Sequence, residues 1–105
     1  MDAKEKIHQT VTQNPFVLYM KGTPQFPQCG FSATAVQVLK ACGVTDFFSV
    51  NVLENADIMR ELKDYANWPT FPQLYINGQL VGGADIMREV YQSGELQRAL
   101  AEIQS

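Results

Sequence analysis

The sequence lacks a long apolar run and has no excess of positive charge. Its 105 residues carry eight Lys and Arg against eleven Asp and Glu, which gives a formal net charge of −3 at pH 7. Because no basic stripe stands out, we expect no nucleic-acid partner. The longest apolar runs fall far short of the roughly 20 residues that span a bilayer. The polar first stretch, MDAKEKIHQTVTQ, has no signal-peptide core. We therefore expect no membrane partner and a cytoplasmic location.

Cysteine is also scarce, since the chain has only Cys29 and Cys42. Two cysteines at this separation do not make the disulfide framework of a small secreted domain. In a reducing compartment, an isolated cysteine serves chemistry or burial rather than cross-linking. The chain is long enough for one domain with its own core and too short for two. We expect residues 1–105 to form a single domain.

Apolar periodicity predicts five helices and four strands. The expected helices cover about residues 3–13 and 30–41, a stretch opening at Asn55 or Asp57, one opening at Asp85, and one after Ser93-Gly94. The expected strands are FVLYM (16–20), DFFSVNV (46–52), QLYI (73–76) and QLVG (79–82). The first two strands are joined through a helix and should be parallel, whereas Asn77-Gly78 makes the last two an antiparallel hairpin. This order predicts an α/β fold with a four-stranded mixed sheet flanked by helices on both faces, the architecture of thioredoxin-like domains.

Cys29 stands where a proline-marked loop meets the start of the second helix. Free N–H groups and the helix dipole stabilise a thiolate there, and such positions lower a thiol pKa from about 8.5 into the range of about 3.5–7.5. Lys21, at the end of the preceding strand, could add positive charge. Ser32, one turn into the helix, can donate a hydrogen bond but cannot resolve a mixed disulfide. The alternative is a structural cysteine in an accidental location, and the position favours the reactive thiol.

Cys42 belongs to the apolar stripe of the same helix, with Phe31, Ala35, Val38 and Leu39. A thiol in such a stripe behaves as a small core residue. At a rise of about 1.5 Å per residue, Cys42 lies roughly 18–20 Å from Cys29 along the helix. A disulfide needs Cα atoms within about 7 Å. Burial is therefore favoured over a redox role for Cys42.

The segment WPTFPQLYINGQLVGGADI supplies the second half of a candidate site. Pro72 comes just after a turn at the start of a strand, where a cis peptide bond would suit. A proline there leaves the backbone of Phe71 free to pair with an extended ligand. Trp68 serves either this site or the core.

The start of the fourth helix completes this half. Gly82-Gly83 permits close approach of a ligand to the backbone, or forms a plain tight turn. Ala84 and Asp85 offer N–H groups for a carboxylate and a side-chain carboxylate for an ammonium group.

Together, KGTPQFPQCGFS, NWPTFPQLYINGQLVGGADI and the order of elements resemble the CGFS-type monothiol glutaredoxins in their short bacterial form, over about residues 4–100. The resemblance implies a glutathione site in which Cys29 meets the glutathione sulfur. It implies that the Phe71 backbone, beside cis-Pro72, pairs with the cysteinyl part and that Lys21 holds the glycine carboxylate. The remaining residues implied at the γ-glutamyl end are Gly83, Ala84 and Asp85.

Two positions depart from the family pattern. The family commonly has a basic residue directly after the position held here by Ile58, but this chain has Met59 there and Arg60 next. Either Arg60 reaches the glutathione carboxylate from a shifted position, or the contact is lost. Ala84 stands where related proteins often carry cysteine, but the implied contact is with the backbone and should survive.

A single accessible thiol agrees with the function that the resemblance implies. A [2Fe-2S] cluster usually takes four thiolates, and two copies of Cys29 with two glutathione sulfurs would supply them. The implied metal ligand is therefore Cys29 in a cluster-bound homodimer that delivers its cluster to iron-sulfur acceptor proteins. Iron-sulfur donor proteins and a BolA-type protein are further partners that rest on the resemblance alone.

Two alternatives remain open. The first is a glutathione-dependent thiol-disulfide oxidoreductase, in which Cys29 takes glutathione from a protein and a second glutathione releases it. We expect at most weak turnover, because Gln28 and Phe26 occupy the approach where dithiol glutaredoxins usually place a tyrosine. The second is a redox-silent interaction domain, in which Cys29→Ser would change nothing measurable.

Overall fold

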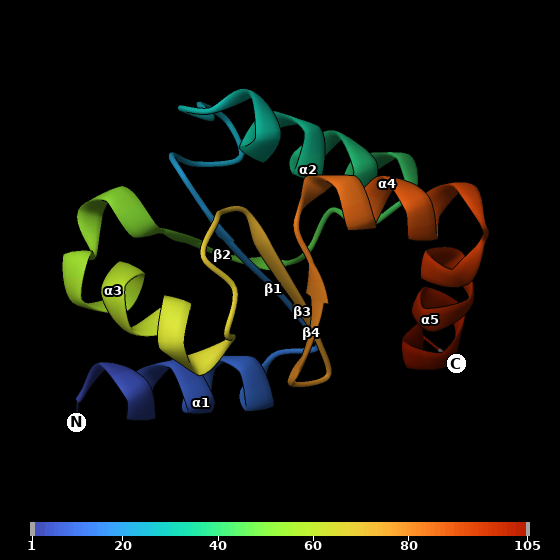
Figure 1. Ribbon diagram of the computed structural model, residues 1–105. Helices are drawn as coiled ribbons and strands as arrows, with labels where there is room; N and C mark the ends of the chain where they lie inside the picture. Colours follow the sequence, from blue (N-terminus) through green and yellow to red (C-terminus); the bar gives the residue numbers. More distant parts are fainter. Residues whose placement is uncertain (1, 105) are drawn as a thin grey trace.

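A four-stranded mixed sheet forms the centre of the computed structural model, which describes residues 2–104, and helices cover both of its faces (Figure 1). In chain order the elements are α1 (Ala3–Gln13), β1 (Phe16–Met20), α2 (Gly30–Ala41), β2 (Phe48–Asn51), a 3-10 turn (Val52–Glu54), α3 (Ala56–Tyr65), β3 (Gln73–Ile76), β4 (Gln79–Gly82), α4 (Ala84–Gln92) and α5 (Glu95–Gln104). Within residues 2–104 no helix is long and apolar enough to cross a membrane.

The strands lie in the order β2-β1-β3-β4. β1 pairs with β2 in parallel and with β3 in antiparallel orientation, and β3 pairs with β4 as a hairpin. The hairpin turns at Asn77 and Gly78, whose φ angles of 51° and 81° are those of the tight turn that favours Asn-Gly. The parallel pair, the hairpin and the thioredoxin-like architecture predicted from the sequence are therefore confirmed.

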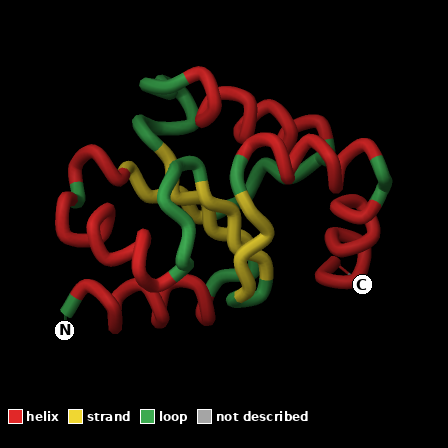
Figure 2. Tube along the Cα trace, viewed as in Figure 1, coloured by secondary structure: helices red, strands yellow, loops and turns green. Residues whose placement is uncertain are grey.

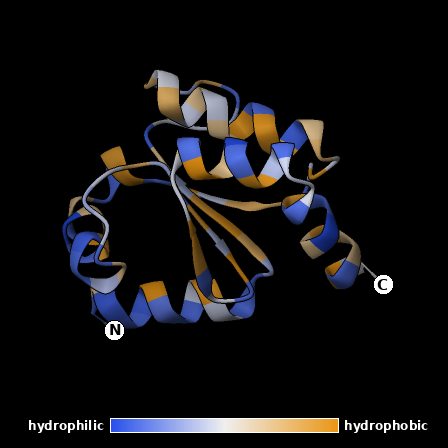
Figure 3. Ribbon diagram, turned by 45° about the vertical axis from the view of Figure 1, so that its right-hand side comes forward, coloured by the Kyte–Doolittle hydropathy of each residue, from blue (hydrophilic) through white to orange (hydrophobic). Residues whose placement is uncertain are grey.

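Each face of the sheet has its own apolar core. β1 is buried along its whole length, and its side chains alternate between the two faces. Leu18 belongs to the cluster that includes residues of α2, α4 and α5, whereas Val17 and Tyr19 belong to the cluster under α1 and α3. Figure 3 shows largely hydrophobic residues in the strands and a mixture of hydrophilic and hydrophobic residues along the helices. With both faces covered, the register of the central strands is strongly specified.

Two local expectations were wrong. β2 covers Phe48–Asn51 rather than 46–52. Its pairing with β1 begins at Phe48, and it ends at Asn51 because the Asn51 side chain accepts the N–H of Leu53 at 3.0 Å and starts a 3-10 turn. Phe31 does not belong to the inner face of α2, since it is 59% exposed. It lies in the first turn of the helix, where the side chain borders a cavity rather than the sheet.

Hydrogen bonds hold the loop between β1 and α2, which leads to Cys29 and is drawn as a loop in Figure 2. The N–H of Gln28 donates to the carbonyl of Lys21 at 2.9 Å, and the N–H of Gly22 donates to Asn51 Oδ1 at 3.0 Å. Gly22 has φ +92°, and a Cβ atom there would lie 2.6 Å from both the Gln28 nitrogen and the Phe26 oxygen. Only glycine therefore allows the loop to close on itself.

Substitution of Gly22 tests this constraint. Gly22→Ala should lower the free energy of unfolding by about 3 kcal/mol, because the new Cβ atom would clash with the backbone in addition to the cost of a positive φ. Gly43→Ala is the matched control, since Gly43 has φ +81° with nothing within 4 Å of its Cβ position, and it should cost only about 1 kcal/mol. Urea unfolding measures both values, and equal losses would contradict the closure argument.

Candidate functional site

Cys29 is the N-cap residue of α2, and its backbone is extended, with φ −150° and ψ 140°. The backbone N–H groups of Ser32 and Phe31 are the main causes that lower the pKa of the Cys29 thiol. Burial of the thiol opposes this slightly, and the positive charge of Lys21 adds a smaller lowering effect. The open end of a helix therefore favours the thiolate, as the sequence predicted.

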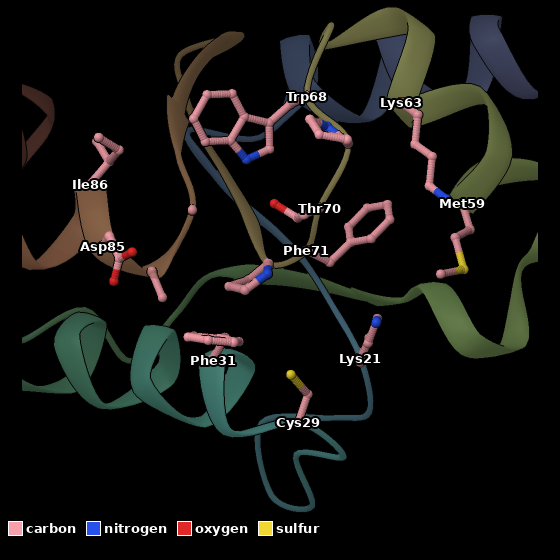
Figure 4. A pocket seen from close by; sticks show the side chains of 14 residues that line it. Lys21, Cys29, Phe31, Met59, Lys63, Trp68, Thr70, Phe71, Asp85 and Ile86 are labelled. Carbon is pink, nitrogen blue, oxygen red and sulfur yellow. The ribbon is translucent and has the colours of Figure 1, made fainter.

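A cavity of about 500 Å³ opens beside the Cys29 sulfur (Figure 4). Its walls come from the end of β1, the start of α2, α3, the segment before β3 and the start of α4. The residues that line it are Lys21, Cys29, Phe31, Met59, Lys63, Trp68, Pro69, Thr70, Phe71, Pro72, Gly83, Ala84, Asp85 and Ile86. The fold therefore brings together every candidate binding residue from the sequence except one.

The exception is Arg60. Its guanidinium group donates to Asp57 Oδ1 at 2.7 Å in an exposed ion pair, and it borders a different depression near the N-terminus. Met59 and Lys63 line the cavity instead. Because successive residues on a helix are rotated by about 100°, Met59 and Lys63 share a face of α3 that Arg60 does not. The four-residue spacing from Met59 is the sequence signal that could have identified Lys63.

Charge is distributed unevenly around the cavity. Lys21 and Lys63 lie on one side of it, with Met59, and Asp85 lies on the opposite side with the start of α4 (Figure 4). A ligand with an anionic end and a cationic end would match this arrangement. The free N–H groups at the start of α4 add a second place for an anion, on the side of Asp85.

Ser32 links the first turn of α2 to the end of β1. Its side chain is 0% exposed, and its hydroxyl oxygen accepts the backbone N–H of Lys21 at 3.0 Å. The structure shows the Ser32 hydroxyl as an acceptor, and hydrogen-bond donation by Ser32, which the sequence suggested, stays a prediction. This bond joins the end of β1 to the first turn of α2, and so it holds the backbone of Lys21 at a fixed position relative to Cys29.

The far wall is formed by the segment before β3 and by Gly83. The Phe71–Pro72 peptide bond is cis, as expected from the sequence. Gly83 has a φ of −93°, which any residue can adopt. Glycine matters here because it has no side chain, not because of its backbone conformation. A Cβ atom on Gly83 would lie 3.3 Å from the Pro72 oxygen and 3.5 Å from Trp68 Nε1. Glycine therefore lets α4 approach this wall closely.

Trp68 belongs to the cavity wall rather than to either core cluster. It is half-buried, and its indole Nε1 is a buried side-chain nitrogen without a hydrogen-bond partner among residues 2–104. In Figure 4 the indole nitrogen lies on the edge of the ring nearer the cavity centre.

Cys42 is half-buried and packs against the larger core cluster. Burial raises the pKa of its thiol. This environment agrees with the packing role expected for it from the sequence.

A family model described as Glutaredoxin matches residues 16–81, which covers more than half of the chain. The chain belongs to the glutaredoxin family. Glutaredoxin 4 of Escherichia coli K12 is 58% identical over 98 residues, which cover 93% of this chain and 84% of that protein. With one thiol in its CGFS motif, this chain is a monothiol glutaredoxin similar to Glutaredoxin 4.

Two solved structures extend the comparison. Reduced poplar apo GrxS14 superposes with a TM-score of 0.80 at 52% identity, over 94% of this chain and 90% of that chain. A buckwheat glutaredoxin–glutathione complex superposes with a TM-score of 0.83 at 25% identity, over 95% of this chain and 88% of that chain.

The thiol pKa can be measured directly. In a Cys42→Ser background, the pH midpoint for iodoacetamide alkylation of Cys29 should be lower in the folded protein than in urea, because the α2 N–H groups stabilise only the folded thiolate. Lys21→Gln should raise the folded midpoint slightly, since the lysine is a lesser cause than the backbone. Identical midpoints in buffer and in urea would disprove this account of the thiol.

Proposed function

We propose that this glutaredoxin binds glutathione in the Cys29 cavity. The observation that carries the proposal is one cavity that holds an accessible thiol with a lowered pKa, cationic groups on one side and a carboxylate on the other. Glutathione offers a thiol, carboxylates at both ends and one ammonium group. The superposition on a glutaredoxin–glutathione complex supports the same ligand.

The charges suggest one orientation for the tripeptide. The glycine carboxylate would lie near Lys21 and Lys63, and the ammonium group of the γ-glutamyl end would pair with Asp85. The γ-glutamyl carboxylate would accept N–H groups at the start of α4, near Gly83 and Ala84. In this orientation the cysteinyl part crosses the cavity beside Phe71 and Pro72, and its sulfur meets Cys29.

We further propose that the bound glutathione allows the protein to carry a [2Fe-2S] cluster. No group of three or more His, Cys, Asp or Glu side chains within residues 2–104 could hold a metal ion. One protomer therefore offers Cys29 and needs other ligands. Two protomers with two glutathione molecules reach the usual set of four thiolates, and the lowered pKa of Cys29 suits a thiolate ligand.

A shared ligand set suits a carrier of clusters as cargo. Half of the ligands would be small molecules that exchange without any unfolding of the protein, so the cluster can be passed on. The proposed partners are iron-sulfur donor and acceptor proteins and a BolA-type protein, and the proposed location is the cytoplasm. Ser32 fits this role because it places no second thiol beside Cys29 that could form a disulfide.

Thiol exchange is the second candidate, and the accessible, low-pKa thiol of Cys29 favours it. The Cys29 thiolate would attack the glutathione sulfur of a protein mixed disulfide and release the protein thiolate. A second glutathione thiolate would then attack the new mixed disulfide, giving glutathione disulfide and regenerating Cys29. Each step forms one S–S bond and breaks one, so no further oxidant is needed.

Anaerobic reconstitution with iron, sulfide and glutathione distinguishes these functions. We expect a coloured dimer, detected by visible absorption and size-exclusion chromatography, that does not form without glutathione or with Cys29→Ser. Cys42→Ser is the matched control and should leave the cluster in place. A colourless monomer with rapid deglutathionylation would favour thiol exchange over cluster transport.

The orientation of the tripeptide can be tested through Lys63. Lys63→Gln should weaken glutathione binding roughly three- to tenfold, as expected for a partly exposed charged hydrogen bond. Arg60→Gln is the matched control on the same helix and should change nothing, because Arg60 lies outside the cavity.

A glutathione analogue with a neutral glycine amide completes this test by titration calorimetry. It should bind wild type and Lys63→Gln with similar affinity, because the charge that Lys63 recognises is gone. If Arg60→Gln weakens binding instead, the proposed place of the glycine carboxylate is incorrect.

A further inference from the structure

Gln73, the first residue of β3, is a fully buried polar side chain, 0% exposed, directly behind the cavity wall. Its amide nitrogen donates to the carbonyl of Trp68 at 3.1 Å and to the carbonyl of Thr70 at 3.2 Å. Its amide oxygen accepts the hydroxyl of Tyr75 at 3.4 Å. Carbonyl oxygens only accept hydrogen bonds, so the amide can satisfy both of them only in this orientation.

Tyr75 holds the other end of the amide. Burial of its ring and the neighbouring Tyr19 raise the pKa of Tyr75 well above the usual value, so its hydroxyl stays protonated and can donate. The ring of Tyr75 is itself packed edge-on against Tyr19, with ring centroids 5.8 Å apart. The Gln73 amide is therefore fixed at both ends.

The hydrogen bond from Gln73 to the Thr70 carbonyl determines the orientation of the Thr70–Phe71 peptide group. The cis bonds among residues 2–104 are limited to Phe71–Pro72, so the Thr70–Phe71 peptide is trans. In a trans peptide the C=O and N–H point in opposite directions. Because the Thr70 carbonyl points to Gln73, the N–H of Phe71 points away from Gln73, and both Thr70 and Phe71 line the cavity.

The N–H of Phe71 has no partner within the described part of the chain. A backbone donor beside a cavity is a place where an extended, peptide-like ligand can bond. A donor that is already oriented binds its acceptor without the entropic cost of ordering the segment first.

We propose that Gln73 is a positioning residue for the ligand site, which holds the 68–70 segment so that the Phe71 N–H is presented to the backbone of the bound peptide. The inference rests on the proposed binding of glutathione, whose cysteinyl carbonyl is the acceptor. Gln73 itself does not touch the ligand, because it is buried behind the wall and does not line the cavity.

NMR titration of the full chain with glutathione tests this role, since it reports affinity and the Phe71 amide signal together. In wild type, the Phe71 amide proton should shift downfield on saturation. Gln73→Met keeps the length of the side chain but donates no hydrogen bond. It should weaken binding about three- to tenfold, the value of one preorganised hydrogen bond, and remove most of the Phe71 shift.

Leu100→Val is the control for a merely structural effect. It removes packing in the α5 core, away from the cavity, and should lower the unfolding temperature while leaving the glutathione affinity and the Phe71 shift unchanged. If Gln73→Met does not fold, Gln73→Glu keeps the shape and replaces two N–H donors by at most one O–H, so it should also weaken binding.

The outcomes separate the two proposals. Wild type that shows no shifts with glutathione overturns the proposed function and the inference with it. Wild type that binds while Gln73→Met, or Gln73→Glu in its place, binds equally well with the same Phe71 shift overturns the positioning role alone. Loss of affinity in the Gln73 variant together with Leu100→Val also overturns it, because destabilisation would then be the cause.

Discussion

The antiparallel pairing of β1 with β3 is the constraint on which the site depends. Tyr19 lies opposite Gln73 in this pair, so the end of β1 lies beside the start of β3. β2 runs parallel to β1 and β4 runs antiparallel to β3. The C-terminal ends of β2 and β4 therefore lie at the same end of the sheet as the C-terminal end of β1. The loop that carries Cys29, the segment before β3 and the start of α4 therefore meet at one cavity, although they are far apart in the sequence.

Partly buried hydrogen bonds keep these segments in place. Ser32 joins β1 to α2 through the N–H of Lys21, Asn51 ties the loop at Gly22 to the end of β2, and Gln73 holds the carbonyls of the segment before β3. Each bond is made by a side chain to a backbone group, which a buried backbone group requires in irregular structure. The resulting cavity contains one thiol with a lowered pKa, two lysines on one side and Asp85 on the other.

Much of this could be predicted from local sequence patterns. The hairpin at Asn77-Gly78, the buried strand β1 and the helix that begins after Cys29 each depend on residues close together in the chain. The segments around Cys29 and Pro72 also identified the two halves of the site. Besides the ends of β2, the predictions that failed concern the direction of a side chain. Arg60 points away from the cavity, and Phe31 borders the cavity instead of the core.

The sequence by itself determined the order of helices and strands, the position of Cys29 at the open end of a helix, the parallel orientation of the first two strands and the final hairpin, because turn residues and apolar periodicity act locally and a helical crossover favours parallel strands. The pairing of β1 with β3 came from the tertiary structure. Only the tertiary structure decided that Lys63 rather than Arg60 reaches the cavity, and that Gln73 faces the carbonyls of Trp68 and Thr70. Both depend on how a helix or segment is rotated against the sheet. That rotation is set by packing between residues distant in the sequence, which no local pattern records.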